Sequence, residues 1–138
     1  MLFKGLAAFA ALVIGVSAGD SVHLVNCGEG VNGSQSADSV VVFCADDSNC
    51  HFNPAPDNFC TVSDGGQLTT WERDGSCAFD TGVTFNWSIE GDARNQPLFS
   101  AVGHASNGQQ SFTCFKDNSP FMYTDSFGQS CVSIYFCL

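Results

Sequence analysis

The candidate residues for acid–base catalysis in this chain are two histidines and a glutamate that is followed directly by an arginine. His23, His104, Glu72 and Arg73 are the residue types that a small secreted ribonuclease uses as base, acid and phosphate clamp. Glu72 and Arg73 are adjacent, however, and adjacent side chains on a strand point to opposite faces. The spacing therefore favours ordinary core or surface roles for these residues over a joint catalytic site.

The remaining candidates for catalysis or metal binding have no supporting motif. The chain has 14 Asp and Glu residues, but no local pattern singles out a pair for glycoside hydrolysis, and no G-x-S-x-G turn marks a serine nucleophile. Residues 46–49 lack the spacing of an EF-hand loop, and Cys44, Cys50 and His51 lack the short spacings of a zinc site. We expect no catalytic residue, metal or cofactor, and keep a secreted ribonuclease or glycosidase as the alternative.

The cysteines are the most informative residues. There are eight of them: Cys27, Cys44, Cys50, Cys60, Cys77, Cys114, Cys131 and Cys137. An even number in a small exported protein favours four disulfides over metal ligands or reactive thiols.

The last two cysteines lie on the uncharged stretch 130–138, whose β-branched and aromatic residues predict a buried strand. Alternation places Cys131 and Cys137 on one face, about 20 Å apart at about 3.3 Å per residue. A disulfide spans only about 6 Å between Cα atoms. Each of the two is therefore expected to bridge to a different segment, which would make the strand a double anchor.

Cys50 and Cys60 flank a loop that has little else to hold it. Pro54 and Pro56 exclude a central strand or helix interior there and favour a turn. We therefore predict a disulfide between Cys50 and Cys60.

The chain starts like an exported protein. Residues 1–18 combine Lys4, an uncharged apolar run and the small residues Val16-Ser17-Ala18, as in a secretory signal peptide. The run of about 12 residues is shorter than the roughly 20 that span a bilayer. We expect a secreted, extracellular protein without a membrane anchor, with residues 19–138 forming a single disulfide-rich β domain.

Charge restricts the partners. The formal net charge is −10, and it becomes −11 when Lys4 leaves with the signal. Such a field repels nucleic-acid phosphates and anionic lipid head groups. We expect no nucleic-acid partner.

Strand signals recur along residues 19–138. Residues 22–27 and the apolar stretch 39–45 predict a short strand and a central strand, and residues 83–89 alternate cleanly between apolar and polar. Asn107-Gly108 predicts a type I′ hairpin between residues 98–104 and 111–116.

Other segments carry weaker signals. Residues 68–73 could form a short strand carrying Trp71, with a turn at Asp74-Gly75. Apolar residues nowhere recur at helical spacing over more than about two turns. The sequence therefore predicts an all-β fold, an antiparallel sandwich or barrel stapled by four disulfides, with at most a short helix within residues 46–60.

Two further features concern the surface. The sequons Asn32-Gly33-Ser34 and Asn86-Trp87-Ser88 make Asn32 and Asn86 candidate glycosylation sites. Four aromatic residues are the ones whose presence burial within a strand explains least well: Phe52, Phe59, Phe121 and Tyr123. They form a candidate contact surface, with packing beneath the loop as the alternative.

The chain resembles, in its format, the small secreted cysteine-rich proteins of filamentous fungi, which include candidate effectors and elicitors of plant cell death. The resemblance covers the signal, the length, the acidic charge, the eight cysteines and the terminal Ser-Ile-Tyr-Phe-Cys-Leu. It implies a stable, secreted β-rich protein that acts by recognising a partner. We expect a monomer that acts without catalysis by binding a host protein or a cell-wall glycan. The competing functions are a secreted hydrolase and a carbohydrate-binding module.

Overall fold

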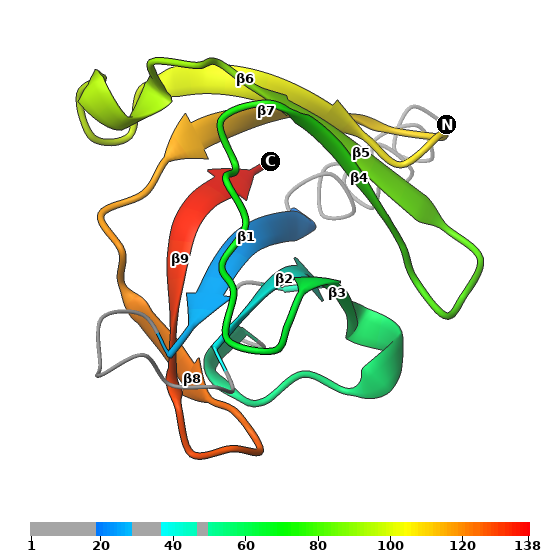
Figure 1. Cartoon of the computed structure of the whole chain (residues 1–138). Helices are drawn as coiled ribbons and strands as arrows, with labels where there is room; N and C mark the ends of the chain where they lie inside the picture. Colours follow the sequence, from blue (N-terminus) through cyan, green and yellow to red (C-terminus); the bar gives the residue numbers. More distant parts are fainter. Residues whose placement is uncertain (1–18, 29–36, 47–49) are drawn as a thin grey trace, which may run out of the picture.

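Antiparallel strands build a nearly closed barrel in the computed structural model, which describes residues 19–28, 37–46 and 50–138 (Figure 1). The strands are β1 (Ser21–Cys27), β2 (Asp38–Cys44), β3 (Phe59–Ser63), β4 (Asp74–Ala78), β5 (Thr84–Ile89), β6 (Ala101–Ser106), β7 (Ser111–Lys116), β8 (Phe121–Thr124) and β9 (Ser130–Cys137). Their order in the sheet is β3-β2-β1-β9-β7-β6-β5-β4, and β8 pairs with β9 beside this path. Short 3-10 helices, η2 (Pro56–Asn58) and η3 (Ala93–Asn95), interrupt the loops. The predicted all-β antiparallel fold is confirmed.

Strand β9 is the centre of the sheet. It pairs with β1 along one side, while β7 and β8 share its other side. The pairing with β1 shifts register between Leu24 and Val25, which skips one residue of β9. An extra residue in a strand moves the following side chains to the other face. Cys131 and Cys137 therefore belong to different clusters on the two sides of the sheet, and the prediction that they share a face is wrong.

Two apolar clusters pack on these two sides. The inner cluster fills the barrel and consists of Val22, Leu24, Val41, Cys60, Trp71, Cys77, Phe79, Phe85, Trp87, Ile89, Ala93, Val102, Ala105, Phe112, Cys114, Tyr135 and Cys137. The outer cluster consists of Val25, Cys27, Val40, Val42, Cys44, Cys50, Met122, Tyr123 and Cys131. Strands β1 and β2 contribute alternate residues to the two, which explains why both are apolar along most of their length.

All eight cysteines form disulfides: Cys27–Cys131, Cys44–Cys50, Cys60–Cys77 and Cys114–Cys137. Two of these join residues directly opposite each other, across β1 and β9 and across β7 and β9. The predictions that all eight cysteines are paired and that β9 is bridged to two different segments are confirmed.

The Cys60–Cys77 disulfide joins β3 to β4, the two ends of the strand order, with 6.1 Å between their Cα atoms. A covalent bond thus holds the barrel together at its open seam. The predicted Cys50–Cys60 disulfide is wrong, because Cys60 on β3 points into the inner cluster whereas Cys50 packs in the outer one. Cys50 pairs instead with Cys44, six residues earlier.

Residues 68–73 do not form the predicted strand. This segment instead links β3 to β4 by crossing the barrel (Figure 1). It buries Trp71 completely, and the indole Nε1 of Trp71 donates to Asn26 Oδ1 at 3.0 Å. Asp74-Gly75 begins β4 rather than a turn. Gly75 fits there because a Cβ atom at this position would lie 2.2 Å from the Trp87 ring.

The hairpin around Gly108 exists, but its turn differs from the prediction. Gly108 has φ +90°, whereas Asn107 does not adopt the positive φ that a type I′ turn requires. The turn is longer, with the backbone N–H of Asn107 donating to the carbonyl of Gln110. The Asn107 side chain accepts from the backbone N–H groups of Gln109 and Gln110.

Candidate functional site

A cleft of about 540 Å³ opens on the outer side of the sheet. Three parts of the chain line it: Cys27, Asp38 and Val40 from the β1–β2 pair; Asn53, Pro54, Phe59, Thr61, Asp64 and Gly65 from the segment around β3; and Tyr123, Asp125, Ser126 and Phe127 from β8 and the turn after it. We call it the acidic cleft, because three of these residues are aspartates and none of the described lining residues is basic.

Asp38, the first residue of β2, has the most perturbed carboxyl group of the cleft. The pKa of Asp38 is raised from 3.8 to about 6. Partial burial is the largest cause, and the negative charges of Asp125 and Asp64 add to it. Its Oδ1 atom is buried and has no hydrogen-bond partner within the described residues. The electrostatics of the cleft therefore disfavour the carboxylate form that Asp38 takes at neutral pH.

Asp125 owes its position to the tight turn between β8 and β9. Its Oδ1 accepts from the backbone N–H groups of Phe127 and Gln129, each at 2.9 Å, and its Oδ2 accepts from the Gln129 side chain. Gly128 closes the turn with φ +78°. The turn thus fixes one carboxylate at the cleft and exposes Phe127 beside it.

The predicted contact surface lies partly around this cleft. Phe59 and Tyr123 line it, and Phe52 precedes the lining residue Asn53. Phe52 and Phe121 are 72% and 58% exposed, as a contact surface requires. Tyr123 is only 3% exposed, so its assignment to an exposed surface is wrong.

Burial of Tyr123 also places its hydroxyl close to the acidic groups. Burial is the main cause that raises the pKa of the Tyr123 hydroxyl above its ordinary value, and the negative charges of Asp38 and Asp125 act in the same direction. Tyr123 is therefore a neutral wall of the cleft at every physiological pH. It belongs to the outer cluster together with its chain neighbour Met122, and both lie on the short strand β8, which pairs with β9.

The aspartates and Phe127 were not singled out from the sequence. Asp64-Gly65 and the residues 125–128 have the composition of solvated turns. The pairing of β3 with β2 brings Asp64-Gly65 to the start of β2. The turn at residues 125–128 reaches the same place through the successive pairings of β8 with β9, β9 with β1 and β1 with β2. The sole available signal was a set of acidic turn residues without neighbouring basic residues.

The two histidines that a ribonuclease site would need lie far from each other. His23 is on β1 and His104 on β6, with β9 and β7 between these strands in the sheet. Three strand spacings of about 4.8 Å separate their strands by roughly 14 Å. His23 Nδ1 lies 2.8 Å from Ser133 Oγ on the outer side of the sheet, and His104 is exposed.

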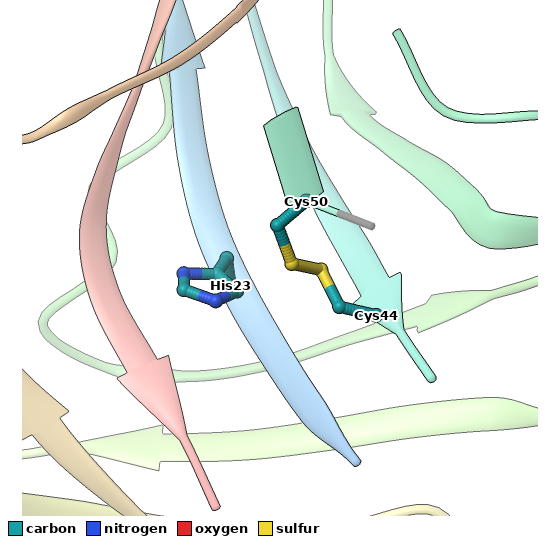
Figure 2. Close-up of side chains that lie close together, drawn as sticks. All are labelled: His23, Cys44 and Cys50. Carbon is teal, nitrogen blue, oxygen red and sulfur yellow. A yellow bond between two sulfur atoms is a disulfide. The ribbon is translucent and has the colours of Figure 1, made fainter. Parts of the chain in front are cut away.

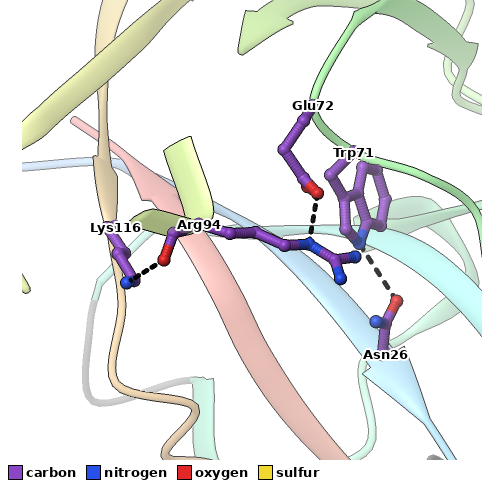
Figure 3. Close-up of polar contacts among 5 residues, drawn as sticks. All are labelled: Asn26, Trp71, Glu72, Arg94 and Lys116. Carbon is purple, nitrogen blue, oxygen red and sulfur yellow. Dashed lines mark hydrogen bonds and ion pairs between the residues drawn. The ribbon is translucent and has the colours of Figure 1, made fainter. Parts of the chain in front are cut away.

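Glu72 has a structural partner rather than a catalytic one. Its buried side chain accepts from Arg94 Nε, and Figure 3 shows this ion pair beside the Trp71–Asn26 hydrogen bond. Lys116 Nζ donates to the backbone carbonyls of Arg94 and Gln96. Two of the few basic residues therefore hold η3 and the residue that follows it against the barrel. Arg73 is exposed.

Two groups of metal-ligand residue types occur in the described chain, and disulfide sulfur atoms dominate both. His23 lies beside the Cys44–Cys50 disulfide (Figure 2), and Asp125 lies beside Cys27–Cys131. A disulfide offers no thiolate to a metal ion, so neither group is a metal centre in the oxidised protein.

Asn86 belongs to the second of the two glycosylation sequons. Asn86 is exposed on β5, between the buried residues Phe85 and Trp87, so its side chain is available for modification. Asn32 lies outside the described residues.

The chain matches no known protein-family model, no curated protein and no solved structure. In the part of the chain that the structure describes, no helix is long and apolar enough to cross a membrane.

Proposed function

We propose that this is a secreted, non-enzymatic binding protein of the effector or elicitor type, which holds a basic segment of a partner protein in the acidic cleft. Secretion is supported by the signal-like residues 1–18 and by four disulfides, which persist in oxidising compartments. The single observation that carries the binding proposal is the gathering of Asp38, Asp64 and Asp125 around one cleft, with no basic residue among its described lining residues.

A bound cation would relieve the repulsion within the cleft. The charges of Asp125 and Asp64 contribute to the raised pKa of Asp38, so an incoming positive charge stabilises its carboxylate. Phe127 is 68% exposed and Phe59 lines the same cleft, and aromatic faces attract cations. Guanidinium and ammonium groups fit both features.

The dimensions favour a side chain over a metal ion. A volume of about 540 Å³ is far larger than an ion needs. Within the described residues, the three carboxylates do not form a group in which one oxygen atom of each lies within 4.8 Å of both others. Arginine suits the site better than lysine, because its planar group both pairs with carboxylates and stacks on aromatic rings.

The direct test is calorimetric titration at pH 7.5 with the peptide acetyl-Arg-Arg-Arg-amide. We expect Asp38→Asn/Asp64→Asn to weaken binding at least about tenfold, since two carboxylates near a cation are removed. The control Asp80→Asn/Glu90→Gln removes the same net charge at exposed positions outside the cleft and should change affinity less than about twofold. Equal losses in both variants would show a net-charge effect and would reject the cleft as the site.

Glycoside hydrolysis is the second candidate, because a carboxyl group with a pKa near 6 beside another carboxylate is typical of a general acid. Asp125 argues against it, since both of its oxygen atoms already accept hydrogen bonds within the turn. Incubation with chitin, cellulose and β-glucan separates the possibilities. Turnover that Asp38→Asn abolishes would establish the enzyme, and retention on one glycan without turnover would indicate a carbohydrate-binding module.

A further inference from the structure

A second hollow, of about 230 Å³, lies at one end of the barrel interior. Its apolar lining comes from the inner cluster and residues packed against it: Val22, Phe43, Phe79, Phe85 and Phe112. Val83, in the turn between β4 and β5, lines the same hollow and is 43% exposed. We call this hollow the apolar cavity.

We propose that the apolar cavity binds one small, neutral aromatic molecule that carries a hydroxyl group. The volume sets the size, because an apolar cavity of about 150 Å³ in another protein accommodates benzene. A cavity of about 230 Å³ has room for a larger ring system, but not for a protein segment. The aromatic lining favours a ring, since Phe85 and Phe112 already pack edge to face with 5.7 Å between their centroids.

The rim of the cavity determines the polar end of the ligand. Asn58, Thr81 and Asn107 lie there. The Oδ1 atom of Asn107 accepts two backbone hydrogen bonds, so its amide N–H groups are the part of that side chain that faces a ligand as donors. A hydroxyl oxygen can accept from such donors.

An anionic head group is disfavoured. Asp57 stands at the same rim, and the whole chain carries a net charge of −10. A carboxylate ligand would therefore meet repulsion at the rim and at longer range. This excludes free fatty acids and aromatic acids as preferred ligands and leaves neutral alcohols and phenols.

The test uses 2-naphthol as the probe and 2-naphthoate as its matched anion, followed by amide chemical shifts of the ¹⁵N-labelled protein. We expect saturable shifts with 2-naphthol at residues 79–85, 107 and 112, and at least about tenfold weaker binding of 2-naphthoate. Absence of saturable shifts up to the solubility limit of 2-naphthol would overturn the proposal. Shifts confined to the acidic cleft would overturn it equally.

Variants at exposed positions keep the test independent of folding. Val83→Trp places a large side chain at the cavity and should weaken 2-naphthol binding at least about fivefold. Leu98→Trp adds the same side chain at a position that is 51% exposed and does not line the cavity, and it should bind like the parent. Equal affinity of Val83→Trp and the parent would contradict the assignment.

Discussion

The apolar cavity and the acidic cleft lie at opposite ends of the same strand pair and differ in chemistry. Val22 and Phe43, which are partners in the β1–β2 ladder, line the cavity, whereas the partners Cys27 and Asp38 line the cleft. Val22 and Cys27 are five positions apart on β1, a distance of about 17 Å at about 3.3 Å per residue.

The difference follows from strand geometry. Side chains an odd number of residues apart point to opposite faces, so Val22 faces the barrel interior and Cys27 the outside. A hollow that faces inward is lined by the aromatic residues of the core. A hollow on the outer side is lined by turns, and turns are where Asp64 and Asp125 lie. One sheet thereby carries two sites of different chemistry.

Removal of the disulfide beneath the cleft is expected to have the largest effect on stability. Cys27 and Cys131 are 104 residues apart, and the chain-entropy estimate for Cys27→Ser/Cys131→Ser is a loss of about 4 to 5 kcal/mol in unfolding free energy. The matched control is Cys44→Ser/Cys50→Ser, also in the outer cluster, which closes a separation of only six residues and should lose about 2 kcal/mol. Urea denaturation measures both, and equal losses would contradict the role assigned to Cys27–Cys131.

Replacement of Trp71 tests how much the inner cluster contributes to the free energy of unfolding. Trp71→Ala removes a fully buried ring that packs on Trp87 and donates to Asn26, and it should cost about 3 to 5 kcal/mol. Phe52→Ala is the control, because Phe52 is 72% exposed and its loss should stay within about 0.5 kcal/mol. Thermal and urea unfolding measure the loss of stability in both variants. A small effect of Trp71→Ala would mean that the segment between β3 and β4 does not anchor the barrel.

Replacement of Asp38 should have the smallest effect, and it depends on pH. The folded-state pKa of about 6 lies above the unfolded value of 3.8, so the folded state loses stability as pH rises from about 4 to 6. Asp38→Asn should therefore be more stable than the parent at pH 7, by about 1 kcal/mol after allowance for solvent screening, and similar to it at pH 4.

Melting temperatures at the two pH values measure this effect, with the exposed Asp80→Asn as the control. A stabilisation of equal size at pH 4 and pH 7 would show that the charge of Asp38 is not its cause.

Much of the fold was predictable because its signals are local. The alternation of residues 83–89 and the uncharged stretch 130–138 correspond to β5 and β9. Trp71 was misassigned because tertiary contacts with Asn26 and Trp87, not local pattern, decide its place. The bulge in β9 likewise depends on its pairing with β1, so no rule of alternation within β9 reveals it.

The cleft was less predictable than the fold. Phe59 and Tyr123, two of the four aromatic residues named from the sequence, line the cleft. Asp38, Asp64 and Asp125 each look like a solvated residue at the end of a strand or in a turn. Their mutual repulsion exists only after the sheet has formed. A site built from one strand end and two separate turns has no characteristic spacing in the sequence.

The pKa of Asp38, measured by ¹³C NMR of its carboxyl carbon with and without acetyl-Arg-Arg-Arg-amide, tests the central proposal most directly. The cleft as described predicts a pKa of about 6 in the free protein. Saturation with the peptide should lower this pKa toward 4, because a bound cation stabilises the carboxylate. A pKa near 4 in the free protein, or a pKa that the saturating peptide leaves unchanged, would contradict a cation site in the acidic cleft.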